Sequence, residues 1–147
     1  MSDIHQYQVD LKWNTDRKGT ISSPILPNQI EVATPPEFPK GVAGIWSPEH
    51  LFIASANSCL MTTFLAIAEN SKIEFISFEC SAVGTLDKVD SKYAITEITL
   101  KPKLVIPNTQ NIDKAKRILE MSEKACLISN SIKSILILEP EIIQESF

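Results

Sequence analysis

The sequence predicts an α+β protein whose strands form antiparallel sheets. Three observations predict this class. Segments in which apolar and polar residues alternate occur near both ends of the chain, and polar turns connect several of them. Two segments with helical character separate these strands, so the expected order is strands, helix, strands, helix and strand. We find no internal repeat and no low-complexity segment.

The composition is typical of one soluble globular domain. The length of 147 residues predicts a single domain over residues 1–147. Apolar residues make up 44% of the chain and charged residues 22%, and the net charge is −4. A mildly acidic protein lacks the basic surface that nucleic acids or anionic membranes attract, so we expect neither as a partner.

The first third of the chain predicts a set of hairpins followed by a loop. The alternation from Tyr7 to Trp13 is typical of a half-buried strand, and a turn follows in which Gly19 is free to take a positive φ. Prolines and glycines between residues 35 and 44 exclude a helix or a central strand there. The strands expected in this part comprise residues 7–13, 20–23 and 29–34.

A long helix is expected over residues 48–70. Ser47 suits its N-cap, Pro48 its first position and Glu49 its first turn. Apolar residues lie nearly all round this helix, which predicts that it is buried on most sides. Its apolar stretch, residues 51–68, contains five Ser, Thr and Asn residues, so we do not expect it to span a membrane.

The rest of the chain predicts two strands, a helix and a final strand. Alternation from Ile76 to Gly84 indicates one strand, and a polar turn separates it from a longer strand over residues 92–105. A helix over residues 111–126 and a strand over residues 132–138 follow. The first residues show no basic region followed by an apolar run, which favours a cytoplasmic protein.

Three cysteines are too few for a disulfide framework, and each has a structural interpretation. Cys80 is in phase with the inward face of its strand and is interpreted as a core residue. Cys59 lies deep in the long helix and fits a core role, but small and polar neighbours indicate a cavity. Cys126 ends the second helix, where the helix dipole raises a thiol pKa; it is either a core residue or the resolving partner of an oxidised cysteine.

Other kinds of site have no support in the sequence. His5 and His50 are the only histidines, and neither they nor the cysteines have metal-ligand spacing. The four glycines form no phosphate-binding loop. We therefore expect neither a metal site nor a phosphate-binding loop.

A thiolate at Cys59 is expected to need a cation, because the helix dipole acts mainly over the first turn. Arg17, in the first hairpin turn, is one candidate and is otherwise a solvated turn residue. Glu49 either compensates the helix dipole or holds a guanidinium by two hydrogen bonds.

Four motifs in register resemble those of the OsmC/Ohr family of hydroperoxide-reducing proteins, over about residues 8–139. They are Arg17-Lys-Gly19, Ser47-Pro-Glu49-His-Leu51, Ala56-Asn-Ser-Cys59 and Ala125-Cys126-Leu-Ile-Ser129-Asn130. Leu127 stands where the family often has proline.

The resemblance implies an OsmC-like domain that forms an intertwined homodimer, with antiparallel sheets wrapped around central helices. It implies a cysteine peroxidase that reduces alkyl hydroperoxides, and in some members hydrogen peroxide, without metal or cofactor. Cys59 would become a sulfenic acid beside Arg17, which Glu49 holds, and Cys126 would then form a disulfide with Cys59. An external dithiol, such as a dihydrolipoyl group, would restore both thiols.

Helix geometry adds one expectation about the dimer. Ten residues of helix separate Glu49 from Cys59 by about 15 Å, so Glu49 is predicted to serve Cys59 of the partner subunit. Phe52, Leu60 and Trp46 are predicted to make the site apolar. Two alternatives stay open: a non-enzymatic protein that binds a small apolar ligand, and a structural dimer with idle cysteines.

Overall fold

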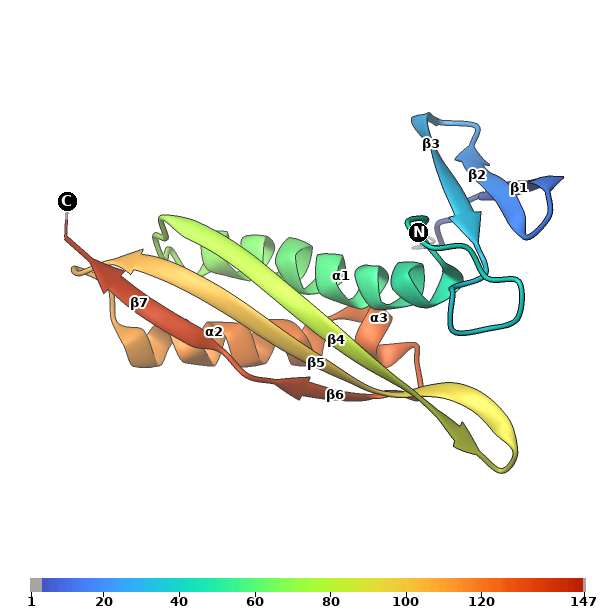
Figure 1. The fold of residues 1–147 in the computed structure, drawn as a ribbon. Coiled ribbons are helices and arrows are strands. Elements are labelled where there is room, and N and C mark those ends of the chain that lie inside the picture. Colours follow the sequence, from blue (N-terminus) through green and yellow to red (C-terminus); the bar gives the residue numbers. More distant parts are fainter. Residues whose placement is uncertain (1–3, 147) are drawn as a thin grey trace. The chain divides into compact units, whose positions relative to one another are not determined.

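The structure, a computed structural model, describes residues 4–146 and contains two compact units, Met1–Leu51 and Phe52–Phe147. The first unit holds strands β1 (Asp10–Thr15), β2 (Lys18–Ser23) and β3 (Leu26–Ala33). They form an antiparallel sheet in the order β1-β2-β3 (Figure 1). The predicted hairpins are therefore confirmed, but the prediction of a half-buried first strand is wrong for the single chain, because β1 is exposed along its whole length.

The turn between β1 and β2 is tighter than predicted. It consists of Asp16 and Arg17, and Asp16 takes the positive φ of 49°. An aspartate tolerates this left-handed conformation better than most residues. The prediction of a positive φ at Gly19 is wrong, because Gly19 is buried within β2, where an added Cβ would lie 3.0 Å from the Lys12 carbonyl oxygen. Close packing between strands explains this glycine.

A closed loop carries the chain from β3 to the first helix. The backbone N–H of Val42 donates to the carbonyl of Thr34, which brings the loop ends together. Gly41 packs so closely on Pro35 that a Cβ would lie 1.9 Å from the Pro35 carbonyl oxygen. The loop ends at the N-cap residue Ser47, whose Oγ accepts the backbone N–H of His50 at 3.2 Å.

Helix α1 spans Pro48–Asn70, as predicted, and continues into the second unit. In the second unit β4 (Ser77–Val89) and β5 (Lys92–Pro107) form a long antiparallel hairpin. Its turn residues Asp90 and Ser91 both have positive φ, the pattern of a type I′ turn.

The sheet of the second unit is mixed, which corrects the prediction of antiparallel strands throughout. Strands β6 (Ile135–Leu138) and β7 (Glu141–Glu145) both pair in parallel with β5. The physical reason is the crossover that joins β5 to β6 through α2 (Ile112–Ala125) and α3 (Leu127–Asn130). Such a helical connection returns the chain in the same direction. Neither α3 nor β7 was predicted.

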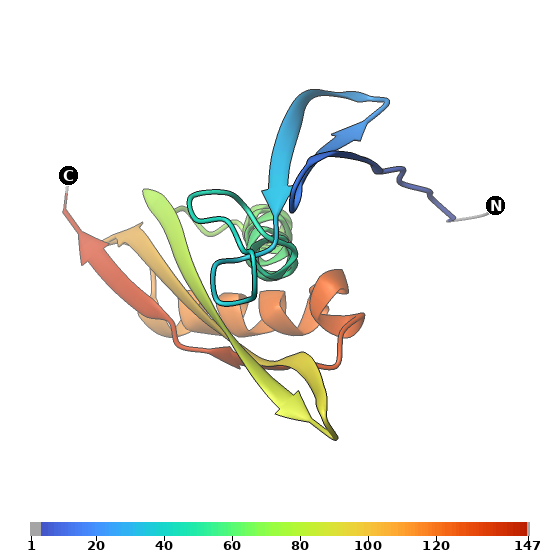
Figure 2. The same ribbon diagram turned by 45° about the vertical axis from the view of Figure 1, so that its right-hand side comes forward.

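The core of the second unit lies between this sheet and the two long helices. Phe64 and Ala68 of α1 pack in one cluster with Leu104 of β5 and Leu119 of α2. A second cluster joins α1 to the sheet farther along, and both views show α2 beside the sheet (Figures 1 and 2). Both helices therefore cover the same face of the sheet.

Helix α1 is less buried than predicted. Only one stripe of it is buried in the single chain: Ala56, Cys59, Leu60, Phe64 and Ala68. Met61 and Leu65 are each about 40% exposed. The prediction of burial on most sides fails because the sheet covers one face only. By length and composition alone α1 could cross a membrane, a property it shares with core helices of soluble proteins.

Candidate active site

Cys59 and Cys126 approach each other from different elements of the second unit. Cys59 lies near the middle of α1 and is 8% exposed. Cys126 is fully buried at the junction of two helices, where it caps the C-terminus of α2 and precedes α3. Both cysteines are free thiols. The fold therefore brings together the two cysteines singled out in the sequence, which lie 67 positions apart.

One hydroxyl contacts both sulfurs. Thr63 follows Cys59 by one helical turn, and its Oγ1 lies 3.8 Å from Cys59 Sγ. The same Oγ1 donates to Cys126 Sγ at 4.0 Å. Both sulfurs therefore lie within 4.0 Å of one oxygen, and the Cys126 side chain hydrogen-bonds Cys59.

The surroundings of Cys59 favour its thiolate. Burial opposes ionisation, but hydrogen bonds lower the pKa of Cys59 below its ordinary value overall. The donors are the Cys126 thiol, the backbone N–H groups of Ile128 and Leu127, and the Thr63 hydroxyl. Hydrogen-bond donors of the same chain therefore lower this pKa, and the expectation that a cation also acts on Cys59 stays a prediction.

Cys126 is shifted in the opposite direction. Burial, followed by the hydrogen bond and the charge of Cys59, raises the pKa of Cys126 to about 11, although Ser129 and Thr63 act against this. The predicted rise in the pKa of Cys126 is confirmed, but its causes are burial and Cys59 rather than the helix dipole. The lowered pKa of Cys59 and the raised pKa of Cys126 favour ionisation at Cys59 and a protonated Cys126 that donates to it.

Cys80 has no part in this pair. It is half-buried on β4 and packs against the second core cluster, as the prediction of a core residue requires. Burial raises the pKa of its thiol to about 11. Its sulfur contacts the carbonyl of Ser81 at 3.8 Å.

An open pocket of about 280 Å³ gives access to Cys59. The hydroxyls of Ser58 and Thr62 donate to carbonyls of their own helix, at 2.7 and 3.1 Å. The hydroxyl of Ser55 does the same, so these residues present mainly carbon to the pocket. The lining residues are Ser55, Ser58, Cys59, Thr62, Leu127 and Ile128.

The predicted apolar lining is wrong for two residues. Phe52 and Leu60 do not line this pocket, because both pack against the sheet in the second core cluster. Trp46 belongs to the first unit and lines another pocket. Leu127 and Ile128 of α3 provide apolar side chains at Cys59 instead. They could not be selected from the sequence because α3 was not predicted.

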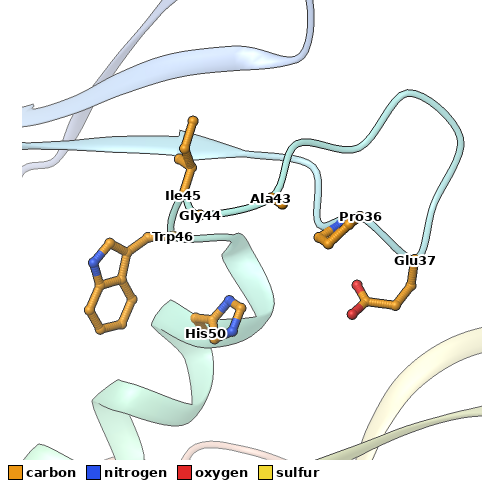
Figure 3. Close-up of a pocket in the computed structure, with 7 residues that line it drawn as sticks. All are labelled: Pro36, Glu37, Ala43, Gly44, Ile45, Trp46 and His50. Atoms are coloured by element: carbon orange, nitrogen blue, oxygen red, sulfur yellow. The ribbon is translucent and has the colours of Figure 1, made fainter.

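The pocket in the first unit, about 430 Å³, lies between the loop and the start of α1 (Figure 3). Trp46 and Glu37 lie on opposite sides of His50 in this view. The His50 ring bonds the Ser47 hydroxyl through Nδ1 at 2.7 Å. Ser47 is fully buried and caps the helix, so this serine–histidine pair has a structural role.

Arg17 and Glu49 lie in the first unit. Arg17 is exposed in the turn between β1 and β2, and Glu49 is half-buried in the first turn of α1. Their predicted roles beside Cys59 stay predictions. Thr63 was not selected from the sequence, although a hydroxyl four positions after a cysteine on a helix is a readable signal.

The chain belongs to the family described as OsmC-like protein, whose profile matches residues 41–140. This confirms the family resemblance seen in the motifs. The family includes cysteine peroxidases and its members are typically dimeric.

One curated relative is similar in sequence, and solved structures are similar in fold. The uncharacterized protein YmaD of Bacillus subtilis (strain 168) is 24% identical over 138 residues, covering 90% of this chain and 89% of that protein. An OsmC-like protein of unknown function from Vibrio cholerae has a TM-score of 0.85 at 23% identity, covering 93% of this chain and 99% of that one. An organic hydroperoxide resistance protein from Elizabethkingia anophelis has a TM-score of 0.77 at 18% identity, covering 99% and 100%.

Proposed function

We propose that this protein is a thiol-dependent peroxidase that reduces organic hydroperoxides to alcohols. The observation that carries the proposal is the pair of neighbouring thiols with opposite pKa shifts, lowered at Cys59 and raised at Cys126. A peroxidatic cysteine must be a thiolate at neutral pH, because the thiolate is the nucleophile. A resolving cysteine needs only to be within reach and to release its proton when it reacts.

The reaction proceeds in three balanced steps. The Cys59 thiolate attacks the oxygen of ROOH distal to the alkyl group, the O–O bond breaks, and the alkoxide leaves as ROH after taking up a proton. Cys59 is then a sulfenic acid, oxidised by two electrons. The Cys126 sulfur attacks Cys59 Sγ, the S–O bond breaks, and water leaves with the Cys126 proton. An external dithiol reduces the resulting disulfide by thiol exchange.

The pocket supports an organic rather than a purely inorganic peroxide. Leu127 is 66% exposed, and together with Ile128 it places apolar surface beside the sulfur. The neighbouring hydroxyls are turned toward helix carbonyls. An alkyl group can therefore contact carbon while its peroxide end reaches Cys59, and hydrogen peroxide lacks that contact.

The remaining parts of the proposal concern the dimer. Arg17, held by Glu49, stabilises the negative charge that develops on the leaving oxygen. Glu49 comes from the partner subunit of an intertwined homodimer, because about 15 Å of helix separates it from Cys59 of its own chain. The reducing cytoplasm supplies the dithiol, for example a dihydrolipoyl group.

Peroxide consumption tests the proposal directly. Purified protein is mixed with cumene hydroperoxide and dihydrolipoamide, and loss of peroxide is followed. Cys59→Ser is expected to abolish turnover, and Arg17→Ala nearly so. Cys126→Ser is expected to consume one peroxide per site and then stall at the sulfenic acid. Cys80→Ser is the matched control and should retain turnover, because Cys80 lies outside the pair.

Full activity in Cys59→Ser would contradict the proposal. Unmodified thiols in the wild-type protein after excess peroxide would also contradict it. That second result would favour the alternative in which the same pocket binds a small apolar ligand without chemistry.

A further inference from the structure

We propose that Thr63 is a positioning residue of the thiol pair, whose hydroxyl hydrogen-bonds both sulfurs and aligns Cys59 with Cys126 for disulfide formation. The statement about disulfide formation rests on the proposed peroxidase function. The hydrogen bonds between Thr63 and the thiols do not depend on that function, and they can be tested without any peroxide.

The orientation of the Thr63 hydroxyl differs from that of its neighbours. Serine and threonine within a helix ordinarily donate to a carbonyl three or four residues earlier. Ser58 and Thr62 follow this pattern, with bonds to the carbonyls of Ala54 and Cys59. The hydroxyl of Thr63 instead contacts the sulfurs of Cys59 and Cys126, at 3.8 and 4.0 Å.

The position of the Thr63 hydroxyl fits the protons available on the reduced Cys59–Cys126 pair. A hydroxyl has one proton and two lone pairs, so Thr63 can donate to one sulfur and accept from the other. The Thr63 hydroxyl lowers the pKa of each cysteine. Cys126 is the titratable group that shifts the pKa of Cys59. Because the single Cys126 proton bonds Cys59, Thr63 acts as a donor in the resting pair, and its hydroxyl holds both sulfurs within 4.0 Å of one oxygen.

The same position suits the step that closes the disulfide. Cys126 holds its proton firmly, because burial and Cys59 raise its pKa. As its sulfur attacks Cys59 Sγ, the S–H bond breaks and the S–O bond of the sulfenic acid breaks. Thr63 accepts the Cys126 proton and donates its own to the departing oxygen, which leaves as water. The hydroxyl is restored, and no further reactant is needed.

The first experiment measures thiol reactivity without peroxide. Wild-type protein, Thr63→Val and Thr63→Ser are alkylated with iodoacetamide between pH 5 and 10, and mass spectrometry follows the peptide that contains Cys59. Thr63→Val has nearly the same shape but no hydroxyl, so Cys59 should react roughly fivefold more slowly at neutral pH. Its pH midpoint should shift upward, and Thr63→Ser should restore both values.

Thr62→Val is the matched control for this measurement. It removes a hydroxyl from the same helical turn, but one that donates to a backbone carbonyl. The alkylation profile of Cys59 should not change in this variant. Circular dichroism and thermal melting of each variant establish that the fold is retained.

The second experiment follows disulfide closure. One equivalent of cumene hydroperoxide is added to reduced protein, and dimedone traps sulfenic acid at timed intervals. Thr63→Val should form sulfenic acid but close the disulfide roughly tenfold more slowly, and Thr63→Ser should restore closure.

The outcomes separate the two proposals. An unchanged alkylation profile in folded Thr63→Val overturns the role of Thr63, whatever peroxide does. A shifted profile with no oxidation of wild-type Cys59 supports the thiol contacts but contradicts the peroxidase function. A shifted profile with unchanged closure contradicts the role of Thr63 in disulfide formation.

Discussion

The chain has three chemically identical thiols, at Cys59, Cys80 and Cys126. Their surroundings decide which one reacts. Burial raises the pKa of Cys80 and of Cys126 to about 11, in the second case with the help of Cys59. Burial also acts on Cys59, but four hydrogen-bond donors outweigh it and lower the pKa of this thiol. Two of the donors are backbone N–H groups of α3, which any residue except proline would provide at Leu127 and Ile128.

This difference predicts an order of alkylation in the wild-type protein. Only thiolates react with iodoacetamide, and the thiolate fraction rises as pH rises through the folded-state pKa. Cys59 should therefore be alkylated at lower pH than the other two cysteines, while Cys80 and Cys126 should stay unmodified until the pH nears 11. Peptide mass spectrometry after short pulses measures the order. Faster labelling of Cys80 than of Cys59 at pH 7 would contradict it.

At the scale of elements, α1 and β4 are held in unusually close contact. Asn57 of α1 donates from Nδ2 to the carbonyl of Cys80 at 3.0 Å. Farther along, Gly84 of β4 faces Ile53, and a Cβ on Gly84 would lie 2.3 Å from Ile53 Cδ1. The absence of a side chain at Gly84 therefore allows the strand to approach the helix that carries Cys59.

Gly84→Ala is expected to destabilise the protein by about 1–3 kcal/mol, because the new methyl group collides with Ile53. Ile53→Val removes Cδ1, one of the two colliding atoms, and leaves Cγ1, which would lie 2.6 Å from the new Cβ; alone it should cost about 0.5–1.5 kcal/mol. The double variant should recover part of the loss, so the two changes should not be additive. Urea unfolding of all four proteins measures this coupling, and additive losses would contradict the contact.

The turn between β4 and β5 offers a second prediction at this scale. Asp90 and Ser91 have φ values of 51° and 68°, which suit asparagine and glycine better. The variant with Asp90→Asn and Ser91→Gly should gain about 0.5–1 kcal/mol, because it relieves strain at both positions. Thermal unfolding provides the measurement, and a lower melting temperature would argue against the assigned turn.

At the scale of the whole molecule, a single chain leaves many large apolar side chains in water. Leu11 and Trp13 on β1 are about 70% exposed, and Met61 and Leu65 are uncovered on α1. Monomeric proteins rarely expose apolar surface in such quantity. A second copy of the chain would cover it, as the typically dimeric family suggests. We therefore expect a dimer, and sedimentation measures this oligomeric state. Leu65→Glu should shift the equilibrium from dimer toward monomer.

Mixed dimers test whether a site contains residues of both subunits. Glu49→Gln and Cys59→Ser proteins are each expected to be inactive. When the two are unfolded and refolded together, a mixed dimer pairs an intact Cys59 with Glu49 of the partner subunit, and activity should return. If Glu49 serves the cysteine of its own chain, the mixture should stay inactive. Refolded wild-type protein is the control.

Local patterns in the sequence were sufficient to predict most elements. The cap at Ser47 and Pro48 defines the start of α1, and alternation defines the long hairpin. The motifs around Cys59 and Cys126 were sufficient to select the pair. The single domain over residues 1–147 and the roles of Arg17 and Glu49 stay predictions. The direction of β6 could not be predicted from its own residues, since parallel pairing depends on where the crossover returns.

By itself, then, the sequence determined the family, the helix that holds Cys59 and the presence of a second cysteine, because these depend on residue type and short spacing. Only the tertiary structure decided that Thr63, Leu127 and Ile128 surround the sulfur. The physical reason is that a thiol pKa depends on donors a few ångströms away in space, and α3 supplies two of them from more than 60 positions along the chain.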